Sequence, residues 1–361
     1  TVGVRNIAIG DDAQGLLTTG TDNVAIGHLA LNATTTGVEN VAIGTDALGA
    51  NTVGDGNIAI GDDALLLNTT GVNNVAIGRD SLKTQTVSIN NIAIGNNAGG
   101  AVTTGTDNVA IGIGALDAAT TAVENVAIGT DALGACTVGI NNIAIGDDAC
   151  LALTTATACI AIGRDALVGV TTGVNNIAIG DTAGNTITTG TGNIILGQNS
   201  QTLAAGSVDQ IVLGRAVTGV ANGAITIGNG TRAITCNYDT DQTWDAPSDM
   251  RMKNVVRESP LGLDFISRLK PIEYKWKDPS AWPAAFRPKD DASLMNTTRT
   301  VLGMNAQDVK AAMDAVEETV FHGWSEASNG QQMMGESAFV YPLINAIKEL
   351  AAKVATLEAR T

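Results

Sequence analysis

Acidic side chains recur at one fixed position in the N-terminal part of the chain, where they could bind cations. An aspartate stands two residues after a glycine at Asp12, Asp46, Asp63, Asp80, Asp131, Asp148 and Asp165. If these positions stack in register, their carboxylates form a row of oxygen ligands of the kind that divalent cations prefer. Asx residues also favour such bends by bonding to their own backbone, and the Gly-Gly-x-Gly-x-Asp pattern of calcium-binding rolls is missing. The sequence therefore favours a structural role, with no metal site and no cofactor.

The cysteines offer little chemistry. Cys136, Cys150, Cys159 and Cys236 form no Cys-x-x-Cys pair and have no neighbouring histidine. This spacing argues against a zinc site and against a disulfide framework. Cys150 stands where other repeats carry Leu, so we expect these residues to be small buried hydrophobic side chains.

A hydroxyl and an amine stand five residues apart at Ser248 and Lys253. A serine becomes nucleophilic only beside a base, and a lysine serves as that base only if burial or a nearby cation such as Arg251 lowers its pKa. In the alternative interpretation, Ser248 and Asp249 cap the start of a helix and Lys253 is solvated. The spacing alone does not decide between them.

The composition divides the chain into two parts. Of the 361 residues, every aromatic side chain and every proline lies beyond residue 237, in a chain of net charge -16. Residues 1–237 hold 18 acidic and 6 basic side chains (net -12), and residues 238–361 hold 18 and 14 (net -4). Neither part is basic, so a nucleic-acid partner is not expected.

No apolar run is long enough to span a membrane, and Thr1 opens directly into repeats without a leader. We therefore expect no membrane insertion.

The first part is a strict repeat. The motif Asn-[Ile/Val]-Ala-Ile-Gly, or a close variant, returns with a 17-residue period at Asn6, Asn23, Asn40, Asn57, Asn74, Asn91, Asn108, Asn125, Asn142, Asn176 and Asn193. Cys159 and Gln210 occupy the same phase, and a last copy, Ala224 to Gly228, follows at a shorter interval. Such a period is typical of a solenoid whose coils bury apolar surface only by stacking.

Each repeat predicts two short strands, one at the Asn motif and one around Thr-Thr, separated by Gly and an Asp-Ala-Leu bend. Because side chains alternate along a strand, Ile7 and Ile9 share one face and Ala8 lies on the other. We expect stacked coils to form an apolar Ile/Val column and a flat Ala face that a neighbouring chain can approach. The asparagines should form a ladder, and a bulky residue at Gly27 should break a coil.

The repeat motif resembles the head repeats of trimeric autotransporter adhesins, which are parallel β-rolls that trimerise, and similar repeats in phage fibres. The resemblance covers residues 6–228, although the adhesin repeat is usually shorter.

Two other functions fit the repeat less well. Adjacent threonines such as Thr18 and Thr19 point to opposite faces, which disfavours an ice-binding array. A glycan-cleaving shaft would need aromatic platforms, and residues 1–237 have none.

The second part carries several motifs in order: Ser248-Asp249-Met250-Arg251-Met252-Lys253, Leu261 to Ile266, Leu269 to Trp276, Gly303 to Val309 and Tyr341 to Leu350. At these residues the chain resembles the intramolecular chaperone auto-processing domain of phage tailspikes, endosialidases and fibres. The resemblance implies that Ser248 attacks the carbonyl of Pro247 with help from Lys253, while Asp249 and Arg251 belong to the motif. The cut would release residues 248–361. In the alternative, this domain stays attached as a permanent tip.

The C-terminus carries a heptad pattern of apolar residues: Val340, Leu343, Ile347, Leu350, Val354 and Leu357. Three parallel copies of such a helix could bury this stripe and align three chains, which is the slow step for non-local β structure. The alternative is an amphipathic helix packed within its own domain.

These observations predict a mainly β protein with three segments. Residues 1–237 form a parallel β-solenoid shaft of 17-residue coils, residues 238–247 a linker, and residues 248–361 a small α+β chaperone and trimerisation domain ending in a helix over 340–359. We expect a homotrimeric phage tail fibre, exposed on the outside of the virion, whose enzymatic activity is at most a single-turnover Ser/Lys self-cleavage, with no external substrate. Expected partners are a host-surface receptor, either a glycan or an outer-membrane component, and other tail proteins. Receptor contacts would come from variable positions such as His28, Leu29, Arg79 and Lys83, or from the tip. The alternatives are a bacterial trimeric surface adhesin and a glycan-degrading tailspike.

Overall fold

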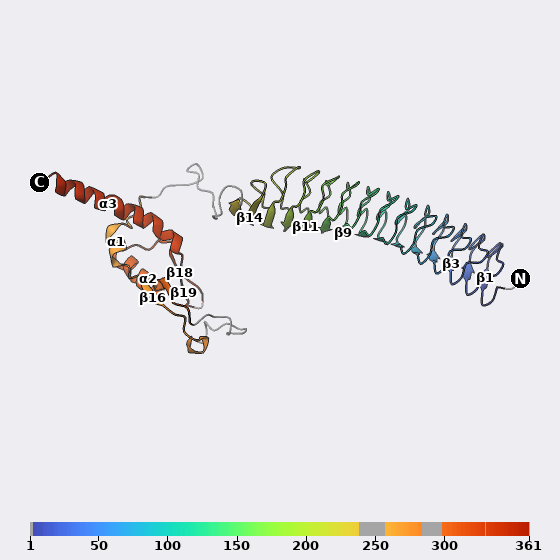
Figure 1. Ribbon diagram of the computed structural model, residues 1–361, viewed down its shortest axis with the longest axis horizontal. Coiled ribbons are helices and arrows are strands. Elements are labelled where there is room, and N and C mark those ends of the chain that lie inside the picture. The colour runs from blue at the N-terminus through green and yellow to red at the C-terminus, as the bar shows by residue number, and fades with distance from the viewer. Residues whose placement is uncertain (1–2, 238–256, 284–297, 329, 361) are drawn as a thin grey trace. The chain divides into compact units, whose positions relative to one another are not determined.

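The chain divides into two compact units, Thr1–Ser248 and Asp249–Thr361. The computed structural model describes residues 3–237, 257–283, 298–328 and 330–360. Within these ranges the first unit is a solenoid and the second is a small mixed domain (Figure 1).

One strand per coil builds the shaft, and the described strands form a single 15-stranded sheet in chain order. The strands are β1 (Ile7–Ile9), β2 (Val24–Ile26), β3 (Val41–Ile43), β4 (Ile58–Ile60), β5 (Val75–Ile77), β6 (Ile92–Ile94), β7 (Val109–Ile111), β8 (Val126–Ile128), β9 (Ile143–Ile145), β10 (Ile160–Ile162), β11 (Ile177–Ile179), β12 (Ile194–Leu196), β13 (Ile211–Arg215), β14 (Ala224–Asn229) and β15 (Arg232–Asn237). Figure 1 shows them stacked one behind another from blue to yellow. The predicted β-solenoid is confirmed.

The repeat period sets the register of the sheet. Ile160 of β10 pairs in parallel with Ile177 of β11, one period later, and the other full-length coils pair in the same way. The shorter last repeat pairs Ile211 with Ile225. After it, β15 turns back and pairs antiparallel with β14, so a hairpin closes this end of the parallel stack.

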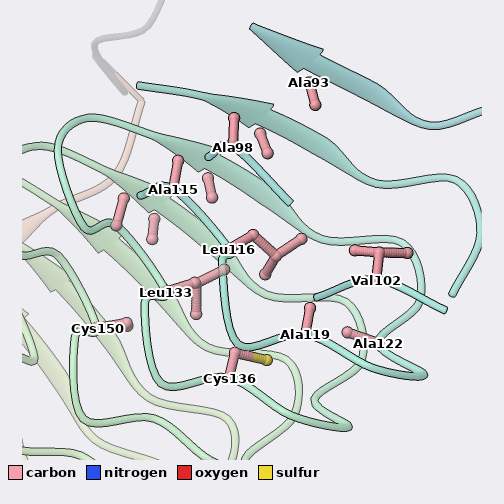
Figure 2. Packing of buried hydrophobic residues seen from close by; sticks show 14 of the residues in the cluster. Ala93, Ala98, Val102, Ala115, Leu116, Ala119, Ala122, Leu133, Cys136 and Cys150 are labelled. Atoms are coloured by element: carbon pink, nitrogen blue, oxygen red, sulfur yellow. The ribbon is translucent and has the colours of Figure 1, made fainter. Parts of the chain in front are cut away.

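The interior of the coils is lined by Ala from the strands and Leu from the turns. Ala42, Ala47 and Leu48 of one coil are fully buried, and Figure 2 shows Leu116 and Leu133 of adjacent coils in the same interior. The expected orientation of the strand faces is therefore wrong: Ala points inward and the Ile/Val column points outward. The reason is volume, because so thin a coil is filled by small strand residues and one Leu per turn.

The turn after each strand uses backbone conformations that few residues adopt. Gly44 has φ 138°, and a Cβ there would lie 2.4 Å from the carbonyl oxygen of Gly61 in the next coil. Asp46 and Leu48 have φ 53° and 51°, in the left-handed region. That conformation costs about 1–2 kcal/mol, but burying a Leu side chain is worth about 1.5–3 kcal/mol. Burial thus holds Leu48 in place, and the Asx preference for this region explains the recurring aspartates.

The Thr-Thr segment joins the coils without forming a strand. The carbonyl oxygen of Thr35 accepts the N–H groups of Thr18 and Thr19, at 3.0 and 3.1 Å, and the Thr18 hydroxyl at 2.8 Å. The second strand expected here is wrong, because one carbonyl serves several donors of the preceding coil and the backbone bends. The first Thr hydroxyl makes this contact between coils in the pairs that begin at Thr18, Thr35, Thr69, Thr103, Thr120, Thr154 and Thr171.

The second unit contains short helices and hairpins around an aromatic core. Its described elements are α1 (Leu263–Arg268), β16 (Ile272–Tyr274), η2 (Pro279–Ala281), β17 (Val301–Gly303), α2 (Ala306–Ala315), β18 (Trp324–Glu326), β19 (Gln332–Met334), η5 (Glu336–Phe339) and α3 (Val340–Glu358). Strands β16 and β17 pair antiparallel, as do β18 and β19. Phe265, Phe321 and Phe339 pack with ring centroids 5.0–6.3 Å apart. No helix in the described ranges is both long and apolar enough to cross a membrane.

Candidate functional site

The residues predicted to perform self-cleavage fall just before the described part of the second unit. Ser248, Asp249, Arg251 and Lys253 lie outside the described residues, which resume at Arg257. The contacts that bear on the motif are therefore those of the chain immediately after it.

Arg257 forms an ion pair with a buried carboxylate. Its Nη2 lies 3.0 and 2.7 Å from Oε1 and Oε2 of Glu318, and the Glu318 side chain is only 2% exposed. Glu318 follows α2, and its Oε1 also accepts the backbone N–H groups of Thr319 and Val320, each at 2.9 Å. A buried charge persists only when it is paired and hydrogen-bonded, and this carboxylate meets both conditions.

Helix α3 holds the residues that follow. The Asn345 side chain donates from Nδ2 to the carbonyl oxygens of Ser259 and Leu261, at 3.3 and 3.2 Å. One turn later, Oε2 of Glu349 accepts the N–H of Leu263 at 3.2 Å, at the start of α1. The chain after Arg257 is thus fixed by side chains that are distant in sequence.

The family model described as the chaperone of endosialidase matches residues 248–318. This chaperone segment begins at Ser248, includes Lys253 and ends at Glu318, so both partners of the buried ion pair lie within it. The match confirms the predicted chaperone part of the chain. Neither the curated proteins nor the solved structures contain a match to the chain.

A second candidate surface runs along the shaft. We call it the outward column: the first and third residues of strands β1 to β12, which are Ile, Val or Leu and point away from the coil interior. Ile94 and Ile162 are 37% and 36% exposed, whereas Ala93 and Ala161, which precede them in the same strands, are 0% exposed. Monomeric proteins rarely expose a long continuous apolar surface.

A third candidate surface lies on α3. The α3 stripe consists of Val340, Leu343, Ile347, Leu350, Val354 and Leu357, all 44–65% exposed. On another face of the helix Pro342 and Ala346 are buried, on the side that packs against α1. The described residues of the unit therefore leave the stripe uncovered, which contradicts the alternative of a helix packed through it within its own domain.

The acidic row and the cysteines carry no catalytic arrangement in the described ranges. Lys83 Nζ bridges Asp63 and Asp80 of neighbouring coils at 2.7 and 2.8 Å. Burial, with a contribution from Asp147, raises the pKa of the Asp148 carboxyl. No group of three or more His, Cys, Asp or Glu among the described residues is placed to hold a metal ion. The thiols are free and buried.

The sequence motifs predict the chaperone part of the chain, but they do not predict the long-range contacts made by Glu318, Asn345 and Glu349. Glu318, Asn345 and Glu349 were not singled out, because their partners lie 61 to 86 residues away. In a single sequence, such pairs carry no spacing signal. Among them only Asn345 and Glu349 lie in a quoted motif, and the motif does not reveal what they bond.

Proposed function

We propose that the chain is part of a homotrimeric phage tail fibre or tailspike-type protein, with a solenoid shaft that assembles with two other copies and a C-terminal unit that directs this assembly. The observation that carries the proposal is the outward column, an apolar surface repeated coil after coil on a shaft whose own core is complete. The chaperone segment supports it, because its family is named for a protein of this class.

The outward column fits a copy of itself. Identical coils present Ile and Val at the same height, and symmetric oligomers form where one surface is complementary to its copies. Within a single chain, Ile94 and Ile162 are 37% and 36% exposed. More than a third of the surface of each residue is therefore available for contact with a neighbouring chain. Burial of the remaining area across the column would supply the favourable free energy of association.

The α3 stripe supports a parallel arrangement. If Val340 and Leu343 take heptad positions a and d, Lys353 falls at g and Glu358 at the following e. In parallel in-register helices a g residue lies beside the next e residue of a neighbour, so Lys353 and Glu358 of two chains attract. Three helices joined this way would bring three shaft ends together before the coils pair, which shortens the slow search for non-local contacts.

Self-cleavage belongs to the same proposal. The Ser248 hydroxyl, deprotonated with the help of Lys253, attacks the carbonyl carbon of Pro247. The amide bond then breaks, the Ser248 nitrogen takes up the proton, and water hydrolyses the resulting ester. The products are a shaft ending at Pro247 and a C-terminal fragment beginning at Ser248. This separation would free a folded shaft from the unit that assembled it.

The shaft would then face the host on the exterior of the virion, with a surface receptor and other tail proteins as partners. The turns offer the positions that vary between coils. His28 is exposed on one turn, and Lys83 on another is tied to Asp63 and Asp80. Variation on a constant scaffold suits recognition of a glycan or an outer-membrane component.

The molar mass in solution tests the assembly. All chains in this test carry Ser248→Ala, so that none cuts itself, and light scattering should give three times the 36.6 kDa of one intact chain. The double variant Ile94→Asp/Ile162→Asp places two charges in the outward column and should lower the mass toward that of one chain. The control Asn96→Asp/Asn199→Asp adds the same charge on the turns and should remain trimeric. A molar mass of 36.6 kDa for the chain that carries Ser248→Ala alone would refute the proposal.

The intact mass of the purified chain beside a Ser248→Ala variant tests the cleavage. The wild type should yield a fragment that begins at Ser248, and the variant should stay whole. If both stay whole, self-cleavage is wrong and the unit is a permanent tip, while the assembly proposal stands on the molar mass.

A further inference from the structure

A second stripe of β-branched residues runs along the shaft, beside the outward column. We call it the flank column: the residue two positions before the repeated Asn of the following coil, from Thr21 to Val208, where Cys159 and Gln210 replace that Asn in two coils. All of its members except Asp55 are Thr, Val or Ile. The flank column thus repeats once per coil, as the outward column does.

The flank column points away from the coil interior and keeps its register. Ile89 and Ile140 are 39% and 41% exposed, whereas Ser88, which precedes Ile89, is 2% exposed. Gly139, which precedes Ile140, is also buried. Such alternation is typical of an extended segment. Ile140 bridges in parallel to Val123, one coil earlier, so the side chains of the column stack coil on coil.

The outward column has one edge that is more exposed than the other. In β3, β9, β10, β11 and β12 the third residue is exposed, whereas the first is only half-buried. Ile145 and Ile179, both third residues, are 37% and 41% exposed. Two positions beyond the third residue, side chains such as Asp147 and Arg164 are exposed and charged. The third residues therefore form an apolar edge that borders on polar surface.

One chain cannot use the flank column to cover this edge. The flank column lies before the start of each strand, and the third residue lies at its end. Between Ile140 and Ile145 stand the Asn corner, Ile143 and the buried Ala144. Two apolar stripes on opposite sides of the same strand can be brought together only by a second copy of the chain.

A threefold axis brings the two stripes together. Strands β1 to β12 stack in parallel, so all of them cross the shaft in the same direction (Figure 1). Rings are built from heterologous contacts, in which two different surfaces of the chain meet. If the outward columns face the axis, the start of each strand lies beside the end of a strand in the next chain.

We infer that the flank column of one chain packs against the third residues of the strands of the next chain, so that the outward column and the flank column together form the interface between copies. The inference deepens the proposed trimer and rests on it. Asp55 is compatible with this contact, because its Oδ1 accepts the backbone N–H of Val38 at 2.8 Å within its own chain. A two-fold dimer would instead bring identical surfaces together.

Cysteine pairs test which surfaces meet. All chains carry Ser248→Ala, so that none cuts itself, and the four native thiols are buried. Ile140→Cys/Ile128→Cys and Ile140→Cys/Ile145→Cys combine the flank column with the third residue of the strand on the same coil and on the next coil. A disulfide forms only where the two Cα atoms lie within about 7 Å. The chains are oxidised mildly and separated by electrophoresis without reductant.

At least one of these two variants should give a covalent trimer, because only two different cysteines per chain can close a ring of three. The matched control is Val138→Cys/Ile145→Cys, since Val138 is 42% exposed but lies two residues farther from the strand. This control and Ile140→Cys alone should give no covalent trimer. A trimeric molar mass with no covalent trimer from either pair would overturn the inference and leave the proposed trimer intact. A monomeric mass before oxidation would refute both.

Charge substitution tests the same contact without cysteines. Ile89→Asp/Ile140→Asp places two charges in the flank column and should raise the concentration at which the trimer dissociates by about tenfold or more, because an unpaired charge is costly to bury. The control Val87→Asp/Val138→Asp adds the same charges at residues that are 50% and 42% exposed, outside the proposed contact. It should change the dissociation much less. Equal dissociation of the two variants, both still folded by circular dichroism, would contradict the inference.

Discussion

Nδ2 of Asn40 lies 3.1 Å from Oδ1 of Asn23, one coil earlier, and donates to the carbonyl of Gly54 at 2.8 Å. The same Oδ1 of Asn23 accepts the backbone N–H of Asn40 at 3.0 Å. In an intact rung such as Asn40, the buried amide thus bonds the coil before it and the coil after it. Because an unpaired buried polar group costs about 1–3 kcal/mol, the ladder stabilises the stack only if its rungs follow without a gap.

Cys159 interrupts this ladder, and restoring it should stabilise the shaft. The backbone N–H of Cys159 donates to Oδ1 of Asn142 at 3.0 Å, but the Cys159 side chain has no amide oxygen to accept the N–H of Asn176. Cys159→Asn should add such bonds and raise the free energy of unfolding by about 1–2 kcal/mol. Denaturant unfolding of the full chain measures the change.

The reciprocal variant is the control for the ladder. Asn142→Cys removes an intact rung, in which Nδ2 donates to Asn125 Oδ1 at 3.0 Å and to the carbonyl of Ala156 at 2.9 Å. Asn142→Cys should lower the free energy of unfolding by a similar amount. A Cys159→Asn variant less stable than the wild type would contradict the prediction.

A side chain at Gly27 should break the stack locally. Gly27 has φ 138°, and a Cβ there would lie 2.4 Å from the carbonyl oxygen of Gly44, part of the next coil's backbone. Since backbone cannot move aside as a side-chain tip can, Gly27→Ala should cost about 2–4 kcal/mol. Gly206→Ala is the control, because its Cβ would meet only Thr189 Oγ1 at 3.5 Å. Thermal melting should show a large decrease in the melting temperature for Gly27→Ala and no such decrease for Gly206→Ala.

The sequence predicted the register of the strands in the shaft, but it did not predict which face of each strand points into the coil. The Asn that returns once per coil fixes which residues pair, because each Asn must reach the next. The Ile-Ala-Ile alternation predicts a strand with an Ile face and an Ala face, but it does not predict which face is buried. Hydrophobicity alone favours burial of the Ile face, whereas in the structure the Ala face is buried. The choice depends on the width of the coil, which Leu48 and its equivalents fill from the turn. In the second unit, motifs predict Ser248 and Lys253, whereas the contacts of Glu318, Asn345 and Glu349 depend on residues that only the fold brings together.

The buried thiols should be unreactive in the folded chain. Burial raises the pKa of Cys136 to about 11 and raises the pKa of Cys150 and of Cys159. At pH 8 the Cys136 thiol stays protonated, and for Cys150 and Cys159 the raised pKa lowers the share of thiolate, which is the reactive form. Alkylation at pH 8 followed by mass spectrometry should leave all three unmodified until denaturant is added. Labelling in the native chain would show that the coils open locally.

Cys236 provides an internal comparison within the same experiment. It lies in β15, the last strand of the sheet, and is 6% exposed, whereas Cys150 is 0% exposed at the centre of the stack. Edge elements open with a lower free energy than central ones. Cys236 should therefore be labelled first at intermediate denaturant concentration, and simultaneous labelling would indicate that the shaft unfolds as one unit.

Charge reversal on α3 distinguishes parallel from antiparallel helices. In a parallel trimer Lys353 at position g lies beside Glu358 at the next position e of a neighbour. Lys353→Glu should place like charges together and weaken the trimer by roughly 0.5 kcal/mol per contact at low salt. The double variant Lys353→Glu/Glu358→Lys should restore the wild-type stability, because each pair is attractive again. Concentration-dependent melting of the full chain measures both. Antiparallel helices would not bring these two positions together, so a double variant as weak as the single one would contradict the parallel arrangement.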